Sequence, residues 1–214
     1  MGSLRFTLLT DGSSDRTLLP ILTWLLQQSG VTADVTGQWA DFRFLRQRPN
    51  ELHDRIRLAL DLYPCELLFI HRDAEAQGRD ARIIEITQAL ITIYHRHPTD
   101  VPAIFVIPVR MQEAWLLIDE DAIRRAAGNP TGNVPFQMPN LNRIEELPDP
   151  KTTLYTLLRT ASGLTGRRLR RLNLPWLRHR VAELIVDFSP LYDLPAFEAL
   201  QNDLTHILAQ NHWA

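Results

Sequence analysis

Segments of strand character and segments of helix character alternate over the first 109 residues. This pattern restricts the possible folds more than any other feature of the sequence. Residues 4–10, 65–73 and 101–109 are short and mostly apolar, while residues 31–40 are β-branched and alternating. Between them, apolar residues recur at helical spacing over 18–26, 52–60 and 83–93. Strands that alternate with helices form parallel sheets covered by helices on both faces. The sequence therefore predicts an α/β, Rossmann-like fold with a mostly parallel sheet.

The character of the chain changes after Val109. The segments "QEAWLLID" and "EDAIRRAAG" are helical in pattern, and Gly128 is a typical helix stop. Residues 129–150 hold five prolines, which disfavour a regular helix. Residues 151–214 look helical throughout. We therefore expect an α/β domain over 1–128, a proline-rich loop over 129–150, and a helical C-terminal region over 151–214 packed on the first domain.

Composition excludes few classes of protein. The chain has 214 residues, a formal net charge of −2 and a single cysteine, Cys65. One cysteine cannot form an internal disulfide, which fits a cytoplasmic protein. No apolar run approaches the length of a membrane span, so we expect no membrane contact. Because the net charge is not basic, any surface that attracts nucleic acid must be local.

Acidic side chains follow three of the predicted strands. Asp11 and Asp15 come after the first strand, Asp73 and Glu75 after the third, and Glu113 shortly after the fourth. The carboxyl ends of parallel strands meet at one edge of a sheet, where ligands bind in open α/β folds. Carboxylates gathered there repel one another unless a cation neutralises them. We therefore expect a site for a hard divalent ion such as Mg²⁺ or Mn²⁺, for which two or three carboxylates suffice.

Each of these acids also has a purely structural interpretation. Asp15 follows Ser14 at a helix start and is a candidate cap or dipole partner. Asp73 and Glu75 are compatible with a solvated turn, and Glu113 opens a helical segment where an acid is favoured electrostatically. The shared placement of the acids at strand ends is what favours the metal site.

Four segments resemble a known family. "TDGSSD" and "DAEAQG" resemble the first and second motifs of the Toprim domain. "PVRMQEAWLLID" and "VAELIVDFSPLYDLPAFEALQNDL" look like segments of a bacterial Toprim-like family of unknown function, related to the nuclease domain of OLD-type (overcoming lysogenization defect) nucleases. The resemblance spans most of the chain, from about residue 5 to residue 208.

This resemblance implies a Toprim-like fold that binds Mg²⁺ or Mn²⁺ and breaks phosphodiester bonds. Asp11 falls where the family has a glutamate that serves as a metal ligand or acid/base group, and Glu113 on an acid of the OLD-like members. Asp73 and Glu75 fall on the metal-binding pair. Two departures alter the reach of the acids: Asp11 is one methylene shorter than the family's glutamate, and Glu75 one longer than its aspartate. By resemblance, the metal ligands are Asp11, Asp73, Glu75 and Glu113, with Asp11 and Glu113 as the catalytic residues.

Further residues are candidates for contact with phosphate. Gly12 lets the turn backbone approach a phosphate at the start of the following helix. A histidine such as His71 is more often just the last residue of a strand, and arginines often belong to a solvated surface. Near the C-terminus, "GRRLRRLN" forms a basic strip, and Arg43, Arg46 and Arg48 form a second cluster. We expect Trp115 and Trp176 to be core residues. The candidate contacts with phosphate or nucleic acid are Gly12, Asp15, Arg16, His71, Arg72, Arg167, Arg168, Arg170 and Arg171.

Two functions follow as hypotheses, and the sequence does not decide whether the protein is an enzyme. The first is a metal-dependent nuclease or phosphoesterase acting on nucleic acid, as a component of a bacterial defence system. The alternative is a non-catalytic Toprim-like regulatory or binding subunit of a larger complex. The sequence has no glycine-rich phosphate loop with a lysine, so any ATPase partner is a separate protein. A haloacid-type phosphatase fits less well, because that chemistry places Asp-x-Asp after the first strand.

Overall fold

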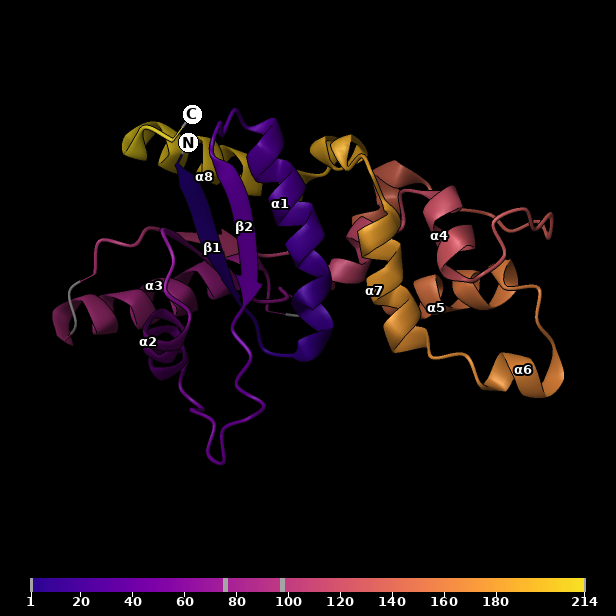
Figure 1. The fold of residues 1–214 in the computed structure, drawn as a ribbon, viewed down its shortest axis with the longest axis horizontal. Coiled ribbons are helices and arrows are strands. Elements are labelled where there is room, and N and C mark those ends of the chain that lie inside the picture. The colour runs from indigo at the N-terminus through magenta and orange to yellow at the C-terminus, as the bar shows by residue number, and fades with distance from the viewer. Residues whose placement is uncertain (1, 75–76, 97–98, 214) are drawn as a thin grey trace.

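A four-stranded parallel sheet organises the part of the molecule that lies toward the left in Figure 1. The computed structural model describes residues 2–74, 77–96 and 99–213. The strand order is β2-β1-β3-β4, and every neighbouring pair is parallel. The predicted α/β class with helices around a parallel sheet is thereby confirmed. The strands are β1 (Ser3–Leu9), β2 (Asp34–Trp39), β3 (Leu67–His71) and β4 (Ala103–Val106).

Helices cover both faces of the sheet, and each face has its own apolar core. On one face, Phe6 and Leu8 of β1 pack against α1 (Leu18–Gln28) and the C-terminal helices. On the other face, Leu68 and Ile70 of β3 pack against α2 (Leu52–Leu62) and α3 (Arg79–Arg96). All five residues of β3 are buried, which explains why this central strand is a continuous apolar run.

The C-terminal part is made of helices that lie in two places in Figure 1: α8 lies by the sheet, whereas the others lie together on the far side of α1. It contains α5 (Pro150–Ala161), the short α6 (Gly166–Arg170), α7 (Leu174–Leu184) and α8 (Pro195–Asn211). The helix α4 (Glu120–Ala126) contacts α5 and α7, whereas α8 contacts β4. The residues assigned by sequence to the first domain and to the C-terminal region therefore share one core.

Short 3-10 helices connect the larger elements: η1 (Ser13–Thr17), η2 (Gln112–Leu116), η3 (Leu141–Glu146) and η4 (Ser189–Asp193). The predicted helix at 112–119 is thus one 3-10 turn, and the prolines of 129–150 admit only η3. The prediction that residues 151–214 are helical throughout is wrong in part. Helix α7 ends at Leu184, and residues 185–188 are irregular.

The two tryptophans predicted to be core residues differ. Trp115 is fully buried, and its ring centroid lies 5.2 Å from that of Phe197 in α8. Trp176 is 55% exposed near the start of α7, so the prediction for it is wrong. The helical periodicity of α7 carries this ring away from the core. No described helix is both long enough and apolar enough to cross a membrane.

Candidate functional site at the carboxyl edge of the sheet

Asp11 and Arg72 meet at the carboxyl edge of the two central strands. Leu9 pairs with Ile70, so the residues that follow β1 and β3 leave the sheet side by side. Oδ1 of Asp11 accepts hydrogen bonds from Nη1 of Arg55, at 2.6 Å, and from Nη1 of Arg72, at 2.8 Å. Arg55, from α2, also donates to the carbonyl oxygen of Thr10. The carboxylate of Asp11 is half exposed, and its Oδ2 accepts no hydrogen bond from a described residue.

Asp15 is buried at the start of η1 and holds the turn after β1 in place. Its carboxylate accepts hydrogen bonds from the backbone N–H of Gly12 at 3.1 Å, the hydroxyl of Ser14 at 2.6 Å and Nε2 of Gln112 at 2.9 Å. Gly12 in turn accepts the backbone N–H of Asp15. These contacts agree with the structural interpretation of Asp15 as a capping residue.

His71, the last residue of β3, lies between two carboxylates. Its ring is 2% exposed, and Nδ1 lies 2.9 Å from the carbonyl oxygen of Val106, which fixes Nδ1 as the donor. Nε2 therefore faces Oδ1 of Asp73 at 3.5 Å and Oδ2 of Asp15 at 4.0 Å. This nitrogen is the polar atom of the ring that faces the two carboxylates.

Glu113 forms a buried ion pair. Its Oε1 accepts a hydrogen bond from Nη1 of Arg178 at 2.5 Å, and the two side chains are 4% and 3% exposed. Arg178 belongs to α7, so this pair joins the segment after β4 to the C-terminal helices. Nε of Arg178 is buried without a hydrogen-bond partner among the described residues.

A basic cleft of about 520 Å³ opens beside the ends of β1 and β2. Gly12 lies on one wall, and three arginines, Arg43, Arg48 and Arg55, line the cleft. The guanidinium carbon of Arg43 lies 5.0 Å from the ring centroid of Trp39. Side-chain and backbone N–H groups of Arg43 also donate hydrogen bonds to Asp41, and these lower the pKa of that carboxyl. Arginine together with an aromatic ring suits phosphate and base contacts.

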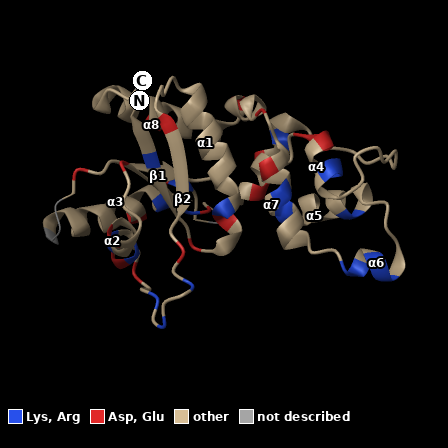
Figure 2. Ribbon diagram, viewed as in Figure 1, with Lys and Arg blue, Asp and Glu red and all other residues tan. Residues whose placement is uncertain are grey.

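Several exposed arginines on this side have no acidic partner among the described residues. Arg16 follows Asp15 in η1, and Arg110 follows β4. The four arginines of "GRRLRR" are exposed on and directly after α6. Figure 2 shows basic residues on α6 and on the segment after β2, both toward the side to which the carboxyl end of β2 points. The predicted basic strip is therefore exposed and forms no ion pair with a described acid.

The described acids do not by themselves make a metal site. No group of three or more His, Cys, Asp or Glu side chains within residues 2–74, 77–96 and 99–213 is placed to hold an ion. Asp11 already binds two guanidinium groups, and Glu113 is buried against Arg178. Glu75, a predicted ligand, lies outside the described residues. The oxygen chemistry of Asp11 and Asp73 suits Mg²⁺, but two arginines already hold Oδ1 of Asp11.

Sequence reasoning missed three residues at or near this edge. Arg55 lies in α2, 44 positions from the carboxylate that it binds, and no local signal points to that contact. Gln112 precedes Glu113, so its place after β4 was a usable signal. Trp176 was assigned to the core, although Asn173 before it marks the exposed first turn of α7.

Comparison with known proteins supplies no relative. No family model, no curated protein and no solved structure is significantly similar to the chain. The function must therefore be argued from the geometry of the carboxyl edge and the adjoining basic surface.

Proposed function

We propose that the protein binds nucleic acid through the carboxyl edge of its sheet and through α6. One observation carries the proposal: exposed arginines that form no ion pair with a described acid gather on one side of a molecule whose net charge is only −2. Such a local field attracts polyanions, and each phosphate that an arginine neutralises releases counterions from the nucleic acid. The cleft at Arg43 and Arg48 adds aromatic surface beside this charge.

A binding role without catalysis fits the partners of the acids best. The arrangement of β1 and β3, each followed by an acid, is that expected of a Toprim-like sheet. Two of the expected metal ligands nevertheless already form ion pairs, Asp11 with two arginines and Glu113 with one. This supports a Toprim-like binding subunit of a larger complex. A separate ATPase or another protein partner, and a role in bacterial defence, stay predictions from the family resemblance.

A metal-dependent nuclease is the second candidate, and the environment of His71 favours it. A buried imidazole whose Nε2 faces Asp15 and Asp73 is a suitable proton acceptor beside a bound phosphodiester. Oδ2 of Asp11 is open toward solvent at the same edge. Hydrolysis would require Arg55 or Arg72 to release Asp11 when the substrate and Mg²⁺ or Mn²⁺ bind.

The test is to measure binding and cleavage together. Fluorescence anisotropy with labelled single-stranded and duplex DNA and RNA, at several salt concentrations, measures binding, and gel analysis with and without Mn²⁺ measures cleavage. We expect affinity to fall as salt rises, without cleavage. Cleavage that needs Mn²⁺ and is lost in Asp73→Ala would establish the nuclease instead. Asp61→Ala, an exposed acid near the far end of α2, is the matched control. Absence of binding in every buffer would contradict both functions.

A further inference from the structure

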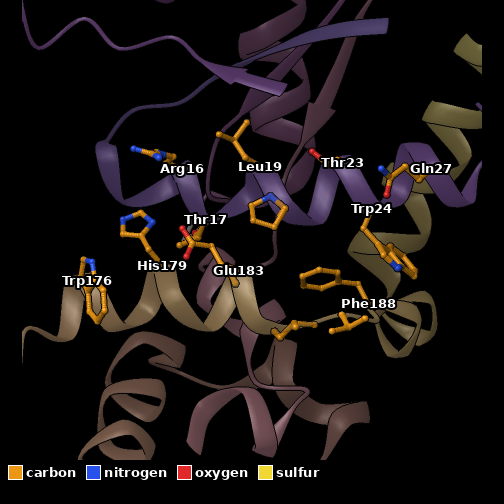
Figure 3. A pocket seen from close by; sticks show the side chains of 14 residues that line it. Arg16, Thr17, Leu19, Thr23, Trp24, Gln27, Trp176, His179, Glu183 and Phe188 are labelled. Carbon is orange, nitrogen blue, oxygen red and sulfur yellow. The ribbon is translucent and has the colours of Figure 1, made fainter. Parts of the chain in front are cut away.

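A cleft of about 590 Å³ lies between α1 and α7, next to the basic side of the molecule (Figure 3). Leu19, Pro20 and Thr23 of α1 form one wall, and α7 forms the other. One end is apolar and well packed, because Trp24 contacts the rings of Phe188 and Tyr192 there. The opposite end is open and polar.

Trp176 and His179 of α7 and Arg16 of η1 define the open end of the cleft. In Figure 3, the side chains of Trp176 and His179 lie one turn apart on α7, below Arg16. The ring of Trp176 is 55% exposed and makes no ring contact with a described residue. A tryptophan left in water contributes little to the core, while its flat face is available to stack on another ring.

Arginines lie on the two segments next to this exposed ring: Arg16 lines the same cleft, and α6 precedes α7 in the chain. Arg16 is exposed and forms no ion pair with a described residue. The arginines of α6 end at Arg171, and the N-cap side chain of Asn173, which accepts the backbone N–H of Trp176, fixes the turn between them. Glu183, the acid in the lining, is already paired with Arg180 at 2.6 Å. The open end is therefore cationic.

His179 completes the lining as a neutral group. Burial, followed by the charges of Arg178 and Arg16, lowers the pKa of His179. A neutral imidazole offers one donor and one acceptor, which suits the edge of a base.

We infer that this cleft receives unpaired bases of single-stranded nucleic acid. A base stacks on Trp176, while Arg16 and the arginines of α6 contact phosphates on either side of it. The inference rests on the proposed nucleic-acid binding and specifies its substrate class. Stacked pairs inside a duplex do not expose their faces, and a cleft between two helices does not admit a duplex. Stacking on aromatic rings is the mode by which sequence-tolerant proteins hold single strands.

The experiment compares Trp176→Ala, Trp176→Phe and wild type for binding of labelled oligothymidylate and of a duplex. We expect Trp176→Ala to weaken oligothymidylate binding roughly 5- to 150-fold and to leave duplex binding unchanged. Trp176→Phe should lose only a few-fold, since it keeps a stacking face. Tyr94→Ala is the matched control, an exposed aromatic ring on α3, and should bind as wild type. Urea unfolding of each variant confirms that folding is intact.

The outcomes separate this inference from the function on which it rests. Unchanged oligothymidylate affinity in Trp176→Ala, or equal weakening for single strand and duplex, overturns the cleft as the single-strand site. If arginine variants of α6 lose binding in the same assay, the proposed function still stands. If wild type binds neither probe, the proposed function fails and the inference fails with it.

Discussion

Arg178 and Glu113 are almost fully buried, and they meet at the junction between the sheet and α7. Burying two charges costs free energy that only close pairing offsets. This buried pair links α7 of the C-terminal helices to the segment after β4. Asp11 differs, because its carboxylate is half exposed to solvent while it forms ion pairs with Arg55 and Arg72.

Removal of one partner of the buried pair should destabilise the fold strongly. We expect Arg178→Ala to lower the free energy of unfolding by about 3–5 kcal/mol, because it leaves the carboxylate of Glu113 buried and unpaired. Urea denaturation followed by circular dichroism measures this. The exposed pair Arg180–Glu183 is the control, and Arg180→Ala should cost under about 1 kcal/mol. Equal effects in the two variants would contradict the assignment.

His179 should make stability depend on pH in the acidic range. Burial and the nearby arginine charges hold its folded pKa below the ordinary 6.5, so the unfolded chain binds a proton more readily. The stability linked to His179 is thus present above about pH 6.5 and is lost as pH falls through the folded pKa. His179→Gln should remove this part of the pH dependence.

NMR titration of the imidazole measures the same effect directly. We expect a pKa below 6.5 for His179 in wild type, and a higher value in Arg16→Gln, because one of the neighbouring positive charges is gone. Arg171→Gln, which contributes no such effect, is the control. A wild-type pKa at or above 6.5 would refute the buried environment.

At the scale of elements, β1 and β2 pack closely because Gly37 of β2 has no side chain. Phe6 of β1 is fully buried and directly opposite Gly37 of β2. A Cβ atom built on Gly37 would lie 2.4 Å from Cζ of Phe6, which no real contact tolerates. The ring covers the glycine, and this contact helps to fix the register of the edge strand.

Adding one methyl group at this position should therefore destabilise the sheet. We expect Gly37→Ala to cost about 1–3 kcal/mol by overpacking, measured by urea denaturation. Gly2→Ala, whose Cβ would meet no atom within 4 Å, is the control and should change stability by less than about 0.5 kcal/mol. Phe6→Leu combined with Gly37→Ala should be less damaging than the sum of the single changes, since the two side chains share one space. Strict additivity would show that the ring is not the obstacle.

At the scale of the whole molecule, charge is distributed unevenly. The chain carries slightly more acids than bases, yet the arginines of α6 stand exposed without acidic partners among the described residues. Acids such as Asp61, Glu120 and Glu183 form ion pairs with arginines outside α6, which leaves this side positive. The distribution, and not the net charge, governs association with a polyanion.

Neutralising the basic strip should reduce the salt dependence of binding. Each contact with a single-strand phosphate contributes about 0.7 to the slope of log K against log salt. Replacing Arg167, Arg168, Arg170 and Arg171 by alanine should therefore reduce the slope by about 3. Titrations of labelled oligothymidylate at several salt concentrations measure it. Arg5→Ala with Arg57→Ala, on paired arginines away from α6, should leave the slope unchanged. An unaltered slope in the α6 variant would exclude the strip from the interface.

The sequence alone was sufficient for the order of the elements. Buried strands such as β3 and amphipathic helices such as α8 repeat their apolar residues at fixed short spacing, so a local window identifies them. Proline positions predicted the break at 129–150, and Pro195 begins α8 as expected. Prediction was weakest where a segment is short or irregular, as at η2 and residues 185–188, because one turn leaves no periodicity to detect.

The sequence by itself determined that acids follow the strands and that arginines cluster in "GRRLRR". Only the tertiary structure decided which charges meet: Asp11 with Arg55 and Arg72, Glu113 with Arg178, and the arginines of α6 with no acid in the described part of the chain. It also left Trp176 in solvent beside a cleft. The physical reason is the separation along the chain of the residues that interact. Backbone periodicity is set by neighbours a few residues apart, whereas the Glu113–Arg178 pair joins side chains 65 positions apart that only packing brings together.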